Sequence, residues 1–298
     1  MPSKTFLFFY GAQKSGTTWL SNHLLLSGQV YNAGLKEWRF WKSYFAGDSD
    51  KRESIKKMYA RIEFGIDRYK REKSRIIALR LKMQQDPVKF LRTCGEVVTH
   101  SSRYHILADC TPSTGTMLTE SQLCRVSMLV QEMGFRPKAL LLLRDPLQRS
   151  VSELSMRVRN DLRRDFTVHG KPGTLEYSRH MDSIIENNLG NLTHRSRFDV
   201  IIKRAKTLET SIPFKTILFD DLFSQNTMDD VSHFLTLEKI VISHQPVNHH
   251  ETVQLSERSL RALASGLRST YQYMKSYFGD RGFPASWSKS LSYFEGGL

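Results

Sequence analysis

The sequence predicts an α/β fold in which helices flank a largely parallel sheet. Short apolar runs of strand length, such as 6–10, 139–143 and 214–219, alternate with segments whose apolar residues recur at helical spacing. The 298 residues are 40% hydrophobic and 11% aromatic, which suits a globular chain that buries a full core. We therefore expect a single domain over residues 1–298, with a basic helical insertion at about 46–100.

Residues that begin and end helices mark the boundaries of these elements. Gly28, Gly134 and Gly279 are placed to end helices, because glycine is favoured just past a helix. Asp145 can cap the helix after the most apolar strand, with Pro146 at its first position. Strands are expected at 6–10, 29–33, 104–109, 139–143 and 214–219. Helices are expected at 19–26, 120–133 and 229–237, and another is expected to begin at 146. A further helix is expected at 256–278 with Ser256 as its cap. Residues 157–200 are predicted to be irregular with one helix.

A run of small and polar residues after the first strand is a candidate phosphate site. The unpaired N–H groups of a helix N-terminus, the helix dipole and Lys14 together attract an anion. Ser15, Thr17 and Thr18 add hydroxyl donors. The order Gly-x-x-Lys-Ser-Gly-Thr-Thr is not the Walker loop, in which the lysine follows the second glycine. A chance turn between strand and helix would look similar, so the segment needs support from elsewhere in the chain.

A second candidate anion site follows the most apolar strand. Arg144 stands at the carboxyl end of this strand, the edge at which open α/β sheets bind ligands. On the next helix Leu147 and Leu154 share one face, while Ser152 lies about 140° from Leu147 at 100° per residue. Arg144 and Ser152 are therefore placed to meet one anionic group, although each alone also suits an ordinary surface position.

Lys36 and Glu37 precede five aromatic residues within 38–45. Charged groups beside aromatic side chains are typical of a pocket wall with reactive groups at its lip. They are equally typical of an aromatic cluster that packs a loop against the core. Both interpretations stay open from the residues alone.

The net charge of +14 points to an anionic ligand, a nucleic acid or an acidic surface. Residues 51–92 are helical in character and hold fourteen basic residues against five acidic ones. This stretch is either a solvated helix face or a cationic lid over an anionic substrate, and it lacks the aromatic interleaving of a nucleic-acid surface. Cys94, Cys110 and Cys124 lack metal-ligand spacing, so we expect free thiols. Because no apolar segment approaches the length of a membrane span, we expect a soluble, cytoplasmic protein.

Taken together, these segments resemble the sulfotransferases that use 3′-phosphoadenosine 5′-phosphosulfate (PAPS). Residues 13–20, Gln-Lys-Ser-Gly-Thr-Thr-Trp-Leu, are similar to their 5′-phosphosulfate loop. Residues 143–152 are similar to their 3′-phosphate motif, with arginine and serine eight positions apart. Glu37 followed by aromatics is similar to the glutamate segment of carbohydrate-type members, such as heparan sulfate sulfotransferases. Residues 111–113 and 218–222 also fall where that family has related segments, and residues 248–279 are similar to the closing helix of its bacterial members.

The resemblance implies a P-loop-type parallel sheet, PAPS as co-substrate, adenosine 3′,5′-bisphosphate (PAP) as product and no required metal. Lys14 would contact the bridging oxygen on which charge grows as the sulfuryl group leaves. Arg144 and Ser152 would hold the 3′-phosphate, and Glu37 would take the proton of the acceptor hydroxyl. The 5′-phosphate would be held by Lys14, Ser15, Gly16, Thr17, Thr18 and Trp19.

Two features depart from the carbohydrate-type pattern. Trp38 and Arg39 stand where those members often carry Pro and His, and residues 244–260 lack the Lys-Gly-Arg loop that covers the donor. Aryl sulfotransferases use a histidine base instead, for which His105 is the nearest candidate. Because His105 falls inside an expected strand, we favour Glu37.

We therefore expect transfer of a sulfuryl group from PAPS to a hydroxyl of a sugar or small-molecule acceptor. An amine acceptor would use much the same groups. One alternative is a P-loop nucleotide kinase-like enzyme with Asp145 as its acidic residue. The other is a basic nucleic-acid-binding protein that uses residues 51–92. Under the favoured hypothesis we expect neither a nucleic-acid partner nor a membrane span.

Overall fold

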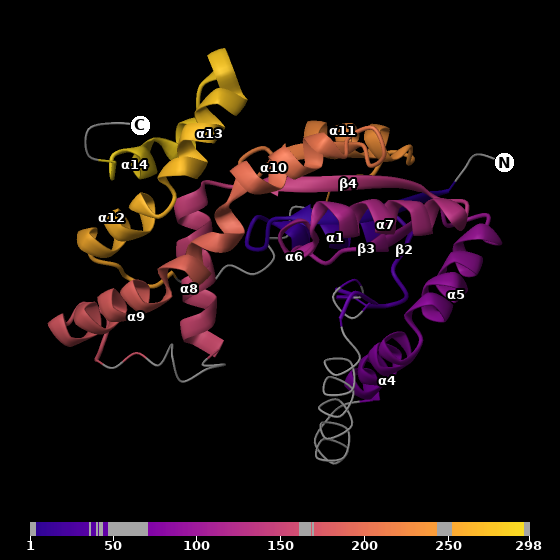
Figure 1. The fold of residues 1–298 in the computed structure, drawn as a ribbon, viewed down its shortest axis with the longest axis horizontal. Coiled ribbons are helices and arrows are strands. Elements are labelled where there is room, and N and C mark those ends of the chain that lie inside the picture. Colours follow the sequence, from indigo (N-terminus) through magenta and orange to yellow (C-terminus); the bar gives the residue numbers. More distant parts are fainter. Residues whose placement is uncertain are drawn as a thin grey trace.

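Five parallel strands form the sheet, in the order β2-β3-β1-β4-β5 (Figure 1). The computed structural model describes residues 4–35, 37–39, 41, 44–46, 71–160, 168, 170–242 and 252–294, and the strand count refers to these residues. The predicted α/β class with a parallel sheet is confirmed. The strands are β1 Thr5–Gly11, β2 Val30–Tyr31, β3 Ile106–Asp109, β4 Arg136–Leu143 and β5 Phe214–Leu218, and each falls on a predicted run.

The central strand β1 pairs with β3 on one side and with β4 on the other. Its side chains alternate between the two faces, so that Phe6 and Phe8 enter one apolar cluster while Leu7 and Phe9 enter another. All four are fully buried, because helices cover both faces as a parallel sheet requires. Since every strand points the same way, the carboxyl ends of the strands meet at one edge.

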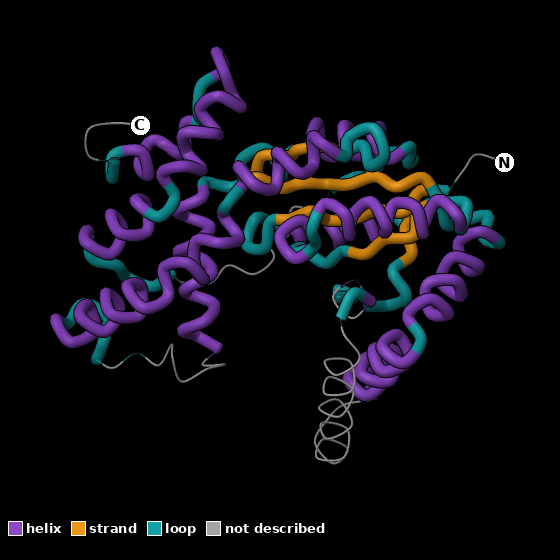
Figure 2. Tube along the Cα trace, in the orientation of Figure 1, coloured by secondary structure: helices purple, strands orange, loops and turns teal. Residues whose placement is uncertain are grey.

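Helices cover both faces of the sheet and also form a group beside it. The helices described are α1 Thr17–Leu26, α4 Arg71–Gln85, α5 Pro87–Thr99, α6 Thr114–Met117, α7 Glu120–Glu132, α8 Pro146–Asn160, α9 Leu175–Thr193, η2 His194–Ser196, α10 Phe198–Thr207, α11 Gln225–Leu235, α12 Glu257–Ser265, α13 Arg268–Phe278, η3 Gly279–Arg281, η4 Ala285–Trp287 and α14 Ser288–Leu291. Helices α1 and α11 pack on the face of Leu7 and Phe9, whereas α5, α7 and α10 pack on the opposite face. Figure 2 shows α8, α9, α12 and α13 gathered at one end of the molecule, away from most of the strands.

Several helix boundaries follow the predicted signals. Asp145 caps α8, because its Oδ1 accepts a hydrogen bond from the Gln148 amide at 2.9 Å. Ser256 caps α12 through the Ser259 amide at 3.0 Å. Gly134 follows α7 with a φ of 81°, in the left-handed region that suits a helix end.

The prediction of one helix at 256–278 is wrong. This segment forms α12 and α13, which separate at Gly266 and Leu267. The two helices pack against different neighbours, α12 against α9 and α13 against α10. The break redirects the chain from one packing partner to the other.

The helix predicted within 157–200 is present as α9, but the described residues hold more helix than predicted. Helix α8 extends to Asn160, and α9 and the first turn of α10 fill much of the remainder. Tyr177, Met181 and Ile184 are buried at helical spacing on α9, a pattern hidden among many polar residues. In the basic stretch, 51–70 lies outside the described residues, while 71–92 is helical as predicted, within α4 and α5.

Replacing Tyr271 by Phe should destabilise the protein by about 1–3 kcal/mol. The fully buried Tyr271 hydroxyl donates to Asp145 Oδ1 at 2.8 Å and accepts from the Leu147 amide at 3.1 Å. In the variant, Asp145 Oδ1 and the Leu147 amide at the start of α8 lose the hydroxyl as a hydrogen-bond partner. The free energy of unfolding, measured by urea denaturation, checks this.

Tyr273→Phe is the matched control, because its partly exposed hydroxyl makes no hydrogen bond within the described chain. It should change the stability by no more than about 0.5 kcal/mol. Equal effects of the two substitutions would contradict the role of Tyr271.

Candidate active site at the carboxyl edge of the sheet

The predicted site residues gather at the carboxyl edge of the sheet, in the order of the strands. Lys14 follows β1 at the centre, and Arg144 follows β4 on one side. Glu37 lies on the other side, because the amide of its neighbour Trp38 donates to Asp109 at the end of β3. The edge therefore presents a carboxylate, a lysine and an arginine across neighbouring strands.

The loop between β1 and α1 is suited to receive an anion. Gly16 takes the cap position with a φ of 86° and adds no side-chain cap, and the first turn of α1 has no acidic residue. The N–H groups at the positive end of the helix are therefore uncompensated by acidic groups of that turn. Thr17 and Thr18 begin this helix, the first buried and the second half-buried. The Ser15 hydroxyl is fully buried, and its Oγ has no hydrogen-bond partner in the described chain, which a bound anion would correct.

Side chains packed around the loop between β1 and α1 restrict which residues fit in it. A Cβ atom at position 16 would lie 2.2 Å from Leu222 Cδ2, so the site needs the small size of glycine as well as its φ. The Trp19 indole packs against His23 and Phe223, with ring centroids 4.0 and 5.2 Å apart. The indole is thus part of the core, and Trp19 offers a ligand its main-chain amide rather than its ring.

Arg144 directly contacts the phosphate loop. Its Nη1 donates to the main-chain carbonyl of Lys14 at 3.0 Å, across 130 residues of sequence. Its guanidinium lies over the Phe219 ring, 4.6 Å from the centroid, and its buried Nε has no hydrogen-bond partner among the described residues. The structure thus brings together the two segments that the sequence analysis singled out, and each retains an unsatisfied polar atom.

Lys14 lies in surroundings that favour a bound anion. Burial, followed by the charges of Arg159 and Arg144, lowers the pKa of its ammonium group. An anionic ligand between these cations would offset their mutual repulsion and so stabilise their charged forms. The Lys14 side chain is half-buried, so a ligand can reach it.

Ser152 lies on α8, two turns after Arg144. Leu147 and Leu154 are buried, so the apolar face predicted for this helix does pack inward. Ser152 is half-buried, and its hydroxyl makes no hydrogen bond within the described residues. It is available to a ligand, without a direct hydrogen bond to Arg144.

Two backbone hydrogen bonds fasten the Glu37 segment to the end of β3. The Trp38 amide donates to Asp109 Oδ1 at 3.3 Å, and the Arg39 amide donates to Thr111 Oγ1 at 2.9 Å. The Thr111 hydroxyl in turn donates to Asp109 Oδ1 at 2.5 Å. The Glu37 side chain, 21% exposed, stays accessible and lies 3.4 Å from Arg39 Nη2. Sequence reasoning missed Asp109 and this clamp.

The aromatic cluster after Glu37 is part of the core. Trp38 and Trp41 are buried and make edge contacts with Phe6 of the central strand. The packing interpretation therefore holds for these two rings. Lys36, predicted beside Glu37, lies outside the described residues.

The basic helices reach the Glu37 segment. Arg80 Nη2 on α4 donates to the Glu37 carbonyl at 3.3 Å, and Phe90 on α5 packs edge-on against Trp38 at 5.4 Å. The described part of the basic stretch therefore lies beside the carboxylate end of the site. His105, the alternative base, precedes β3 at the amino edge of the sheet, opposite Lys14.

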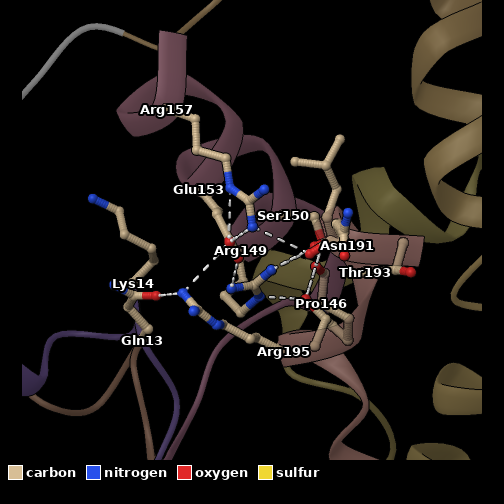
Figure 3. Close-up of polar contacts among 12 residues, drawn as sticks. Gln13, Lys14, Pro146, Arg149, Ser150, Glu153, Arg157, Asn191, Thr193 and Arg195 are labelled. Carbon is tan, nitrogen blue, oxygen red and sulfur yellow. Dashed lines mark hydrogen bonds and ion pairs between the residues drawn. The ribbon is translucent and has the colours of Figure 1, made fainter. Parts of the chain in front are cut away.

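Sequence reasoning also missed an ionic cluster beside Lys14 (Figure 3). Arg149 and Glu153 are fully buried on α8 and form an ion pair at 2.7 Å. Arg157 and Arg195 bind the same carboxylate. Arg149, Glu153 and Arg157 recur every four residues, which places them on one helix face and was the signal available in the sequence.

A cavity of about 640 Å³ lies along β5, the strand at one side of the sheet. Its walls come from β5, α11 and the segment from α13 to η4, and include Leu143, Asp220, Tyr277 and Phe283. Leu143 precedes Arg144 in the chain, but neither Arg144 nor the loop between β1 and α1 lines this cavity.

Three further observations concern the described residues. These residues contain no cluster of three or more His, Cys, Asp or Glu side chains arranged for a metal ion. Cys94, Cys110 and Cys124 form no disulfide, as predicted. None of the helices seen in the described ranges has both the length and the apolar character needed to cross a bilayer.

The fold is similar to that in the crystal structure of a sulfotransferase from Alicyclobacillus acidocaldarius. The TM-score is 0.51, the alignment covers 96% of this chain and 99% of that chain, and 16% of the residues are identical. No protein-family model matches the sequence, and no curated protein is significantly similar to it. At this identity the similarity shows the fold.

Replacing Asp109 by Asn should reduce the pH dependence of stability between about pH 4 and 6. Burial raises the pKa of Asp109 from 3.8 to about 6, although hydrogen bonds from Thr111 and Trp38 oppose the shift. The folded protein therefore holds this proton up to a higher pH than the unfolded chain. As the pH rises through this window, the wild-type protein should lose about 3 kcal/mol relative to the variant. Urea denaturation of both proteins across the pH range measures this.

Asp199→Asn is a control for which the contribution to stability should change with pH in the opposite direction. Burial would raise the pKa of Asp199, but hydrogen bonds from Arg197 and Thr270 outweigh it and hold the pKa below its ordinary value. Asp199 should therefore stabilise the protein above its unfolded pKa and lose this effect as the pH falls. If both variants shifted the pH profile in the same direction, the assignment for Asp109 would be wrong.

Proposed function

We propose that the protein is a sulfotransferase that takes its sulfuryl group from PAPS and delivers it to a hydroxyl of a sugar or small molecule. The contact between Arg144 and the Lys14 carbonyl carries this proposal. It brings together the two segments that would hold the 5′- and the 3′-phosphate of the donor. The similarity of the fold to a solved sulfotransferase supports the same conclusion.

The residues at the edge fit the donor. The N–H groups of Gly16–Trp19 and the hydroxyls of Ser15, Thr17 and Thr18 would hold the 5′-phosphate. Arg144 and Ser152 would hold the 3′-phosphate, the group that distinguishes this donor from ATP. The unsatisfied Ser15 Oγ and Arg144 Nε support an anionic occupant.

The chemistry requires a base, a leaving-group stabiliser and no covalent intermediate. When bound, PAPS supplies a sulfuryl group activated by its phosphate leaving group. Glu37 takes the proton of the acceptor hydroxyl, whose oxygen forms a new bond to sulfur. The bond between sulfur and the bridging phosphate oxygen breaks, and its electron pair stays on that oxygen. The Lys14 ammonium stabilises the charge that develops there, and PAP is released.

The acceptor would approach from the Glu37 side of the edge. Helices α4 and α5 lie there, and Arg80 touches the Glu37 carbonyl. The basic character of this region favours a polar or anionic acceptor, such as a sugar, over an apolar one. An amine acceptor would need the same base and the same donor site.

Two alternative functions are less well supported. A kinase-like reading needs Asp145 near a metal, yet its Oδ1 accepts from Tyr271 and Gln148, and the residue is 2% exposed. Activity with ATP that disappears on addition of EDTA would support that reading. Steeply salt-dependent binding of duplex DNA, unaffected by Lys14→Ala, would support a nucleic-acid-binding protein.

Glu37→Gln should retain donor binding but lower turnover by about 10²- to 10⁴-fold, because glutamine keeps the shape and loses the basicity. Turnover is measured with labelled PAPS and a panel of hydroxylated metabolites and glycans. Retention of the donor site is measured as the affinity for PAP by calorimetry. His105→Gln is the control, because this residue lies at the opposite edge of the sheet, and it should keep nearly normal turnover. An active Glu37→Gln enzyme would show that another group is the base.

Arg144→Lys should weaken binding of PAP by about 10-fold or more while weakening adenosine 5′-phosphate by less than about threefold. The reason is that PAP carries the 3′-phosphate and adenosine 5′-phosphate does not. Lysine keeps the positive charge and so limits the disturbance of the loop. Titration calorimetry with both nucleotides measures the two affinities. Equal losses would refute the assignment of Arg144 to the 3′-phosphate.

A further inference from the structure

Arg195 reaches the phosphate loop from a different layer of the protein. It lies in η2, between α9 and α10, and this turn packs against α8. Its Nη1 donates to Gln13 Oε1 and lies 3.5 Å from Glu153 Oε1 (Figure 3). Because Gln13 directly precedes Lys14, the Arg195 guanidinium lies against the loop that carries this lysine.

The cluster around Arg195 carries an excess of positive charge. Glu153 is fully buried and is shared by Arg149, Arg157 and Arg195. Burial would raise the pKa of Glu153, but the three guanidinium groups outweigh burial and hold its pKa below the ordinary value. Glu153 is therefore ionised and balances one of three positive charges. The remaining charge includes Arg195, which lies against the loop at Gln13 and favours an anion there.

The three arginines differ in how many N–H groups the protein uses. Arg149 is fully buried, and each of its three nitrogens donates to a protein acceptor. Arg157 donates to Glu153 and to a main-chain carbonyl on α9. Arg195 uses Nη1, whereas its Nε and Nη2 donate to no atom of the described residues. Its side chain is 35% exposed, so these two nitrogens are available to a ligand.

We propose that Arg195 binds the sulfuryl group of the donor through these remaining N–H groups. The inference rests on the proposed function, in which the sulfuryl group lies at Lys14. During transfer the bond from sulfur to the phosphate oxygen breaks, a bond to the acceptor oxygen forms and Glu37 takes the proton. Arg195 donates to the oxygens that stay on sulfur throughout, while Lys14 stabilises the leaving oxygen. Glu153 and Gln13 hold the guanidinium in this orientation.

Binding of PAPS and PAP to Arg195→Met, without acceptor, tests the proposal. PAP has both phosphates of the donor but no sulfuryl group. A lost charge-assisted contact should lower the affinity for PAPS by about 10- to 100-fold and leave the affinity for PAP within about twofold. Titration calorimetry gives both values, and turnover should fall with PAPS affinity. Arg195→Lys, which keeps the charge, should show a smaller loss that is again confined to PAPS.

Arg157→Met is the matched control, because it removes one arginine from the same carboxylate without touching the loop. It should leave the ratio of PAPS to PAP affinity at the wild-type value. Equal losses for both nucleotides in the Arg195 variants would overturn the proposal and make Arg195 a support of the loop through Gln13. Unchanged affinities for both would also overturn it. A wild-type protein that binds neither nucleotide would instead refute the proposed function itself.

Discussion

The common direction of the five strands is the constraint on which the candidate site depends. Lys14 and Arg144 are far apart in sequence, yet each follows the carboxyl end of a strand, and β1 lies beside β4. Asp109 ends β3 on the other side of β1 and holds the Glu37 segment there. In an antiparallel sheet, neighbouring strand ends of this kind would point to opposite edges. The parallel pairing thus converts three separate loops into one row of charged groups.

The fold and the position of two candidate segments at the sheet edge were predictable because their signals are local. The apolar run of β4 and the cap at Asp145 depend on residues close in sequence, and so does the left-handed Gly16 before α1. General rules about sheet edges then place Arg144 near the loop. The prediction of a single helix at 256–278 was wrong for the opposite reason. Its break at Gly266 reflects which neighbours α12 and α13 pack against, and no local pattern records this.

The remaining parts of the site depend on contacts between distant segments. The four-residue spacing of Glu153 from its arginine neighbours on α8 indicates ion pairs on one helix face, but exposed helices show the same spacing. The burial of Glu153 becomes clear only when α9 and η2 cover α8. Arg195 meets Gln13 across 182 residues, so neither residue points to the other from its surroundings. Asp109 was equally hidden, because its carboxylate accepts from the Trp38 amide of a distant segment as well as from Thr111 nearby. A charged residue that is buried by distant elements has no signature in its own neighbourhood.

The clamp between Asp109 and the Glu37 segment also constrains how this chain can vary. The hydrogen bond from position 38 is donated by a main-chain N–H, which proline lacks. Any residue other than proline at position 38 can donate this bond, so the backbone rather than the indole of Trp38 serves Asp109. An exchange of tryptophan for proline would leave the buried carboxylate with one donor fewer, and it would favour a compensating change at the end of β3.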